Sequence, residues 1–101
     1  MKNKTSKLRN LEKNRYSILT NDFENCYLCD DKADHIHEVF AGGNRKMSMA
    51  NGFCLPLCYT HHNIAQINYT SGLELKRLMQ RKYEENHTRE EFIRLVGKSY
   101  L

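Results

Sequence analysis

The hydrophobic pattern of this chain changes from alternation in its first half to helical spacing in its second half. Residues 33–40 alternate polar and apolar side chains, which predicts a strand with its two histidines on one face and Glu38 on the other. Residues 53–57 predict a second short strand, whose proline indicates an edge or a strand end. Between them, residues 41–52 contain two adjacent glycines and are expected to form a loop.

Helical spacing follows the second expected strand. Apolar residues three and four positions apart predict one helix that starts at His61 and two further helices after Tyr69. Each of the two later helices has a Ser/Thr-x-x-Glu capping box near its start (Ser71 with Glu74, and Thr88 with Glu91). Gly97 stands where a residue with positive φ commonly ends a helix. We therefore expect an α+β fold with a strand pair, a helix and two C-terminal helices.

Residues 1–22 form a basic segment that precedes the expected domain at residues 23–101. The apolar residues of this segment have only a weak helical spacing, so a short helix and a partly disordered tail both fit the pattern. Its lysines and arginines could contact phosphates, or they could simply be solvated.

The expected strands, the first expected helix and the residues next to them contain a cluster of cysteines and histidines that could bind a metal ion. All four cysteines and four of the five histidines lie between residues 26 and 62. Thiolate and neutral imidazole are the usual ligands of zinc. Two short pairs, Cys26-x-x-Cys29 and Cys58-x-x-His61, predict two knuckles that close around one ion. Four protein ligands leave no open position, so we expect a structural zinc that stabilises a small core.

Cys54 leaves one alternative open for this zinc. On a short strand, Cys54 and Cys58 would point to the same side, so this pair could replace Cys58 and His61 at the ion. The other interpretation is that Cys54 is a small buried apolar side chain.

Charge and hydropathy narrow the classes of partner. Sixteen Lys and Arg against twelve Asp and Glu give a net charge of +4, which permits a polyanionic partner without requiring one. No apolar run approaches the roughly 20 residues that cross a bilayer, and the N-terminus has no apolar signal-peptide region. We therefore expect no membrane association and a cytoplasmic location, where clustered cysteines more often bind metal than form disulfides. The oligomeric state is not indicated.

The order of a CxxC pair, a histidine-containing strand, a GGNR loop and an LC-x-x-HH pattern resembles the HNH endonuclease family. Residues 37–45, HEVFAGGNR, are similar to the HHxFGGxNR pattern of a small phage-type branch, and the C-terminal helices are similar too. The resemblance covers residues 24–101. It implies a ββα-metal fold above a zinc knuckle pair, a phage or prophage origin, DNA as the partner and the host cytoplasm as the location.

The resemblance also implies a catalytic ion, which would be Mg²⁺, Mn²⁺, Ni²⁺ or Zn²⁺. His37 from the strand and His62 from the helix are the implied ligands of this ion, which would polarise a phosphate oxygen. The family usually has His as the general base directly after the first ligand, where this chain has Glu38, a weaker base at neutral pH. In an alternative register, Asp34 binds the metal and His35 is the base.

The remaining implied positions orient the base or bind substrate. The middle Asn of the motif, which orients the base, corresponds best to Asn51, with Asn44 as the alternative. Asn44 and Arg45 are implied to bind a substrate phosphate, since Arg donates bidentate charge-assisted hydrogen bonds; a plain turn with a surface Arg is the other interpretation. Members of the branch often carry another His after the HH pair, and this chain has none in residues 63–69. A metal there would need oxygen ligands and water.

Together, these expectations predict a metal-dependent HNH endonuclease that hydrolyses DNA phosphodiester bonds. The alternative is a catalytically weakened zinc module that binds nucleic acid or a protein partner, which Glu38 and the missing imidazole motivate. A third possibility is a purely structural zinc protein, such as an inhibitor of another nuclease, which predicts one metal per chain and no DNA affinity.

Overall fold

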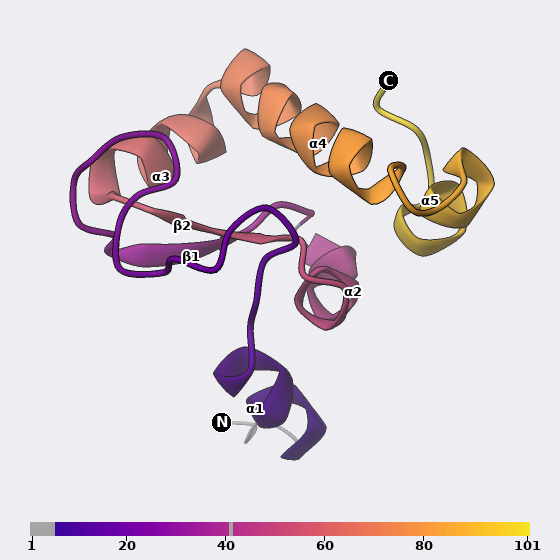
Figure 1. The fold of residues 1–101 in the computed structure, drawn as a ribbon, viewed down its shortest axis with the longest axis horizontal. Coiled ribbons are helices and arrows are strands. Elements are labelled where there is room, and N and C mark those ends of the chain that lie inside the picture. Colours follow the sequence, from indigo (N-terminus) through magenta and orange to yellow (C-terminus); the bar gives the residue numbers. More distant parts are fainter. Residues whose placement is uncertain (1–5, 41) are drawn as a thin grey trace.

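The computed structural model describes residues 6–40 and 42–101, and its fold is built on a two-stranded antiparallel sheet (Figure 1). The predicted α+β class is confirmed. In chain order the elements are α1 (Ser6–Lys13), β1 (His35–Glu38), the 3₁₀ helix η1 (Gly42–Asn44), α2 (Arg45–Ala50), β2 (Cys54–Leu57), α3 (Tyr59–Ile67), α4 (Tyr69–Tyr83) and α5 (Arg89–Val96). In Figure 1, α3 and α2 lie at opposite ends of the hairpin, and α4 leads from α3 towards α5.

Both predicted strands are present, and they form a hairpin in which His35 pairs with Leu57. All of β2 is buried, whereas β1 ranges from half-buried to exposed. Pro56 fits within the paired strand because its carbonyl points away from β1 and accepts the backbone N–H of Tyr27 at 2.8 Å. The ladder therefore never requires the N–H that proline lacks.

The segment 41–52, predicted to be a loop, is mostly helical in its described part, because η1 and α2 occupy residues 42–50. The buried hydroxyl of Ser48 donates to the carbonyl of Phe40 at 2.6 Å and accepts its N–H at 3.2 Å, which fastens α2 to the end of β1. Gly52 has a φ of 74°, and a Cβ at this position would lie 2.5 Å from the ring of Tyr16. The loop prediction was wrong because six helical residues are too few to show a periodicity.

Helix α3 begins at Tyr59, two residues before the predicted start. Cys58 is its N-cap, and the sulfur of Cys58 accepts the backbone N–H of His61 at 3.4 Å. The carboxylate of Asp34 accepts the backbone N–H of Tyr59 at 3.0 Å. These two acceptors satisfy N–H groups that a helix start leaves without intrahelical partners.

Helix α4 begins at Tyr69, and its N-cap is Asn68, whose side chain accepts the N–H of Ser71 at 3.0 Å. The predicted capping box at Ser71 is therefore wrong. Because α3 ends one residue before Asn68, the two helices share that residue as a corner. Gly72 allows the helices to approach closely, since a Cβ there would lie 2.8 Å from the carbonyl oxygen of Ala65.

The predicted boundaries of the last helix are confirmed. Thr88 and Glu91 form a reciprocal capping box, in which the Thr88 hydroxyl accepts the Glu91 N–H at 3.1 Å and the Glu91 carboxylate accepts the Thr88 N–H at 3.0 Å. Gly97 ends α5 in the left-handed conformation, with a φ of 107°.

Aromatic rings form the core between the hairpin and the C-terminal helices. The ring of Phe53 lies 5.4 Å from Phe40, 5.6 Å from Tyr83 and 6.1 Å from Phe92, measured between centroids. Tyr100 completes the group at 5.6 Å from Phe40. The three phenylalanines are almost fully buried. Such ring pairs stabilise a core somewhat beyond the area they bury.

The N-terminal segment contains a short helix, α1, that packs on α2. No residue of α1 is buried, but the chain after it joins the core, because Ser17 pairs with Phe53 in an isolated bridge. The helical interpretation of this segment is therefore confirmed for residues 6–13. Residues 1–5, the start of the predicted basic segment, lie outside the described residues.

Candidate metal centre and histidine cleft

The structure brings the predicted Cys₃His set together, although its two halves are far apart in sequence. The ligand atoms of Cys26, Cys29, Cys58 and His61 all lie within 4.8 Å of one another. Cys29 Sγ is 3.8 Å from Cys58 Sγ, and Cys26 Sγ is 3.7 Å from His61 Nδ1. Tetrahedral zinc, with Zn–S bonds of about 2.3 Å, places its ligand atoms roughly 3.5–3.8 Å apart. The set can therefore hold a metal ion and has the composition of a structural zinc site.

One thiol of the first knuckle, Cys26, ionises more readily than an ordinary cysteine. Cys26 and Cys58 are both only 5 % exposed. Burial opposes ionisation of Cys26, but hydrogen bonds from the backbone at Cys58 and Leu28 and from Cys29 outweigh it and lower the pKa of Cys26 to about 7. A thiol that ionises near neutral pH supplies the thiolate that zinc requires.

Cys54 lies outside this set. It is fully buried, and its Sγ is 3.9 Å from the carbonyl oxygen of Ser48. Burial raises the pKa of Cys54 to about 12, so this thiol stays protonated. The alternative in which Cys54 replaces His61 at the ion is therefore wrong, and the interpretation as a buried apolar side chain is confirmed. All four thiols are free of disulfides.

A second group of imidazoles, two of which line a cleft, lies beside the Cys₃His set. The ring of His62 stacks on His35 at 4.5 Å between centroids and meets the ring of His37 edge-on at 5.4 Å. The cleft has a volume of about 520 Å³, and Gln66 and Lys76 are among the residues that line it with His37 and His62. Within residues 6–40 and 42–101, the Cys₃His set is the one group of three or more potential ligands whose ligand atoms all lie close enough together to hold a metal ion. His37 and His62 line the cleft, and His35 lies beside it in ring contact with His62.

The pKa values of two of these imidazoles, His37 and His62, lie below the ordinary value of histidine. Burial, assisted by the positive charges of His62 and Lys76 and opposed by Glu38, lowers the pKa of His37 to about 4. Burial and the neighbouring His35 also lower the pKa of His62. A neutral imidazole has a free lone pair, so both rings can act as ligands of a divalent ion.

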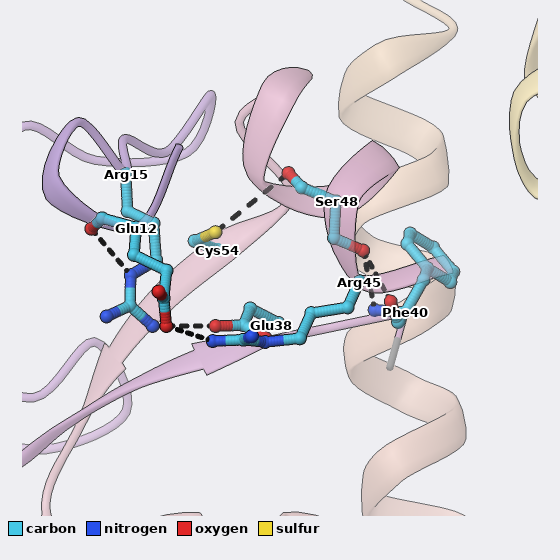
Figure 2. A network of polar contacts seen from close by, with 7 residues as sticks. All are labelled: Glu12, Arg15, Glu38, Phe40, Arg45, Ser48 and Cys54. Atoms are coloured by element: carbon cyan, nitrogen blue, oxygen red, sulfur yellow. Dashed lines mark hydrogen bonds and ion pairs between the residues drawn. The ribbon is translucent and has the colours of Figure 1, made fainter. Parts of the chain in front are cut away.

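Glu38 borders the cleft, but its carboxylate is occupied by two arginines (Figure 2). One carboxylate oxygen accepts from Arg15 at 2.6 Å and the other from Arg45 at 2.6 Å. Arg45 also bonds Glu12 at 2.6 Å, and these two carboxylates raise the pKa of Arg45. The Glu38 side chain is only 12 % exposed. The four charges therefore fasten the N-terminal segment and α2 to β1.

The other residues implied to act in catalysis or substrate binding make bonds within the fold. The Asn51 side chain donates to a carbonyl of α2 at 2.9 Å, not to the strands of the hairpin. The Asn44 side chain donates to the last residue of α5 at 3.2 Å, which joins η1 to that helix. Asp34, the metal ligand of the alternative register, caps the start of α3.

Lys76, which lines the cleft, was not identified from the sequence. It follows Leu75, a residue of the apolar stripe of α4, and the spacing of that stripe does not indicate that Lys76 would lie beside the histidines. Its position depends on the angle between α3 and α4, which Gly72 helps to set. The ion pairs of Glu38 were also missed, because Arg15 lies 23 residues away in sequence.

Comparisons with known proteins found no matching family, no similar curated protein and no similar solved structure. In the part of the chain that the structure describes, no helix has the length and apolar character needed to cross a membrane.

Proposed function

We propose that this protein is a metal-dependent HNH endonuclease, encoded by a phage or prophage, that hydrolyses DNA phosphodiester bonds. The proposal rests on the divergence of two neighbours on α3: the ring of His61 lies among the cysteines, and that of His62 lies beside His37 in the cleft. Successive helix residues point about 100° apart, so one helix can contribute to a closed site and to an open one. A ββα-metal core above a zinc knuckle pair would have this arrangement.

His37 and His62 are the residues that would hold the catalytic ion. Both rings are neutral near pH 7, and they leave further coordination positions to phosphate oxygens and water, which Mg²⁺ and Mn²⁺ accept readily. When bound, such an ion polarises a phosphate oxygen and stabilises the leaving alkoxide. The fixed stacking of His62 on His35 would orient the ligand ring in the cleft.

We assign the general base to His35 in preference to Glu38. Both oxygens of Glu38 accept from guanidinium groups, so the carboxylate is already engaged in ion pairs that hold the fold together. His35 is exposed and lies in ring contact with His62. Imidazole is also the side chain that most readily accepts a proton near neutral pH.

A binding module without catalysis is the second candidate function. It is favoured by the ion pairs that occupy Glu38, where the family usually has a histidine base. The segment after His62 also contributes no further imidazole, so the proposed ion would have only two nitrogen ligands.

Plasmid nicking tests the two candidates. We expect the zinc-loaded chain to nick supercoiled DNA with Mg²⁺, Mn²⁺ or Ni²⁺, and H62A to lose this activity while it keeps one zinc per chain. We expect H35A to reduce the rate roughly 10²- to 10⁴-fold, the usual contribution of a general base. E38Q should retain most of the rate, because Glu38 does not touch substrate in this proposal.

Each variant can overturn a specific assignment. Nicking that persists in H62A would reject His62 as a ligand. A folded E38Q variant without activity would return the base to Glu38. A wild-type protein that binds DNA but cuts it with none of these metals would favour the binding module.

A further inference from the structure

The histidine cleft continues into a second hollow, which we name the lysine hollow. It has a volume of about 400 Å³. Its polar, cationic and aromatic lining includes Asn68, Tyr69, Lys76, Arg77, Lys98 and Tyr100. The cleft and the lysine hollow share Ala65, Gln66, Gly72 and Lys76. A ligand that enters the cleft can therefore extend into the lysine hollow without crossing the protein.

Two ammonium groups are held over one aromatic ring in this hollow. Lys76 Nζ lies 5.3 Å and Lys98 Nζ lies 4.9 Å from the ring centroid of Tyr100. Within the described residues, neither ammonium pairs with a carboxylate, whereas Lys82 on the same helix pairs with Glu85 at 3.3 Å. Each ammonium group can therefore attract an anionic group of a ligand.

The tail that carries Tyr100 is fixed in place. The fully buried Gln80 accepts the Tyr100 N–H at 2.8 Å, and Arg77 donates to the Tyr100 carbonyl at 2.9 Å. No acidic residue lines the lysine hollow, and the one acidic residue of the cleft, Glu38, is bound by its two arginines. The connected surface therefore has a net positive charge on a rigid support.

An exposed aromatic ring lies in the same hollow. Tyr69 lines it and is 83 % exposed. A solvated tyrosine beside cationic side chains has the composition of surfaces that bind single-stranded nucleic acid, where bases stack on rings and cations follow the phosphates. Stacking of this kind needs unpaired bases, because a duplex keeps its bases stacked on each other.

We propose that the cleft and the lysine hollow form one groove that binds an unpaired nucleic-acid strand. In this groove Lys76 and Lys98 bind phosphates that flank the scissile one, and Tyr69 stacks on a base. The inference rests on the proposed nuclease function, and it specifies the substrate as a single-stranded segment, such as a flap, gap or loop, that reaches the histidines.

Fluorescence anisotropy with a labelled 12-nucleotide DNA of mixed sequence tests the groove. The zinc-loaded H62A protein serves as the background, so that cleavage does not disturb the measurement. We expect K76Q combined with K98Q to weaken binding roughly tenfold or more at 0.1 M salt and to lower the salt slope by about 1.4, or about 0.7 for each lost phosphate contact. K82Q, a matched change on the same helix outside the groove, should leave affinity and slope almost unchanged.

A matched pair of variants tests whether the ring of Tyr69 stacks on a base. Y69A should weaken binding by at least about fivefold, whereas Y69F, which keeps the ring, should bind like the parent protein. A duplex of the same sequence should bind more weakly than the single strand. Circular dichroism and the zinc content of each variant verify that the groove, not the fold, was changed.

Three outcomes would overturn the groove: no binding of the oligonucleotide, equal losses in K82Q and the double variant, or duplex preference with no effect of Y69A. These results are separable from the nuclease test. If the wild-type protein nicks DNA while the groove variants bind and cleave normally, the groove fails and the nuclease proposal stands. If binding depends on Lys76 and Lys98 but no metal supports cleavage of either the plasmid or a single-stranded flap, the groove stands and the nuclease proposal fails.

Discussion

The two ends of the β hairpin are stabilised by different means. At the α3 end, which we call the metal end, three thiols and one imidazole meet, and nearby Tyr27 and Leu28 are 36 % and 45 % exposed. At the α2 end, which we call the aromatic end, the rings of Phe40, Phe53 and Phe92 are nearly fully buried. The first knuckle thus exposes two large apolar side chains at the metal end, whereas the aromatic end buries its rings.

The buried aromatic core and the histidine cleft therefore lie in different parts of the molecule. The aromatic end can be stable through burial alone, whereas the segment of the first knuckle has no helix and only one isolated bridge, between Asn25 and Lys32. The histidine cleft adjoins the metal end, because His62 follows a ligand of the Cys₃His set. The geometry of the cleft should therefore depend on the structural ion more than on the core.

Loss of the structural ion should have the largest effect. Structural zinc in small domains contributes an apparent free energy of about 10–16 kcal/mol, comparable with the whole stability of a domain, about 5–15 kcal/mol. We expect C58S to lose zinc and to unfold the metal end, and a strong chelator to do the same to the wild-type protein. Zinc content by atomic emission and far-UV circular dichroism measure this.

Cys54 offers a matched control for that prediction. C54A also removes a buried thiol of β2, but it should keep one zinc per chain and lower the free energy of unfolding by roughly 1 kcal/mol. Equal zinc loss in C54A and C58S would contradict the separation of the two thiols.

Truncation at the aromatic end should have the next largest effect. F53A removes a ring that contacts Phe40, Tyr83 and Phe92, and it should lower the free energy of unfolding by about 3–5 kcal/mol. Urea denaturation in the presence of zinc measures this loss. Because Phe53 is not part of the Cys₃His set, the folded variant should still bind one zinc. A folded F53A protein without zinc would show that the two ends are coupled.

The capping box of α5 should have the smallest effect. T88A removes the hydroxyl that accepts the Glu91 N–H, and it should lower the free energy of unfolding by about 1 kcal/mol. Urea denaturation should show a lower midpoint with an unchanged slope, and T88S, which keeps the hydroxyl, should behave like the wild type. Altered nicking or zinc content in T88A would mean that the C-terminal helices affect the metal end.

Features with a local chemical signature could be predicted from the sequence. The spacing of Cys26 with Cys29 and of Cys58 with His61 identified the metal set, because each pair bridges a short turn. Thr88 and Glu91 likewise identified a helix start within four residues. Within each pair the two residues are close in sequence, so their spacing alone indicates the local geometry, although the two halves of the Cys₃His set are brought together only by the fold.

Features that depend on long-range packing could not be predicted in this way. Glu38 looked like a base in the motif, but Arg15 reaches it from 23 residues earlier in the chain. Ser48 fastens α2 through Phe40, and a single serine in a Gly-rich segment carries no sign of that bond. Lys76 faces the histidines only because α3 and α4 meet at one particular angle.

The angle between α3 and α4 depends on the absence of a side chain at Gly72. The carbonyl of Ala65 occupies the space where a Cβ on Gly72 would stand, so any larger residue must separate the two helices. The residue at position 72 therefore affects the distance across the cleft between the imidazoles of His37 and His62 and the ammonium group of Lys76. A graded series of residues at position 72 would change the width of the groove, and each added side-chain atom would also become part of its lining.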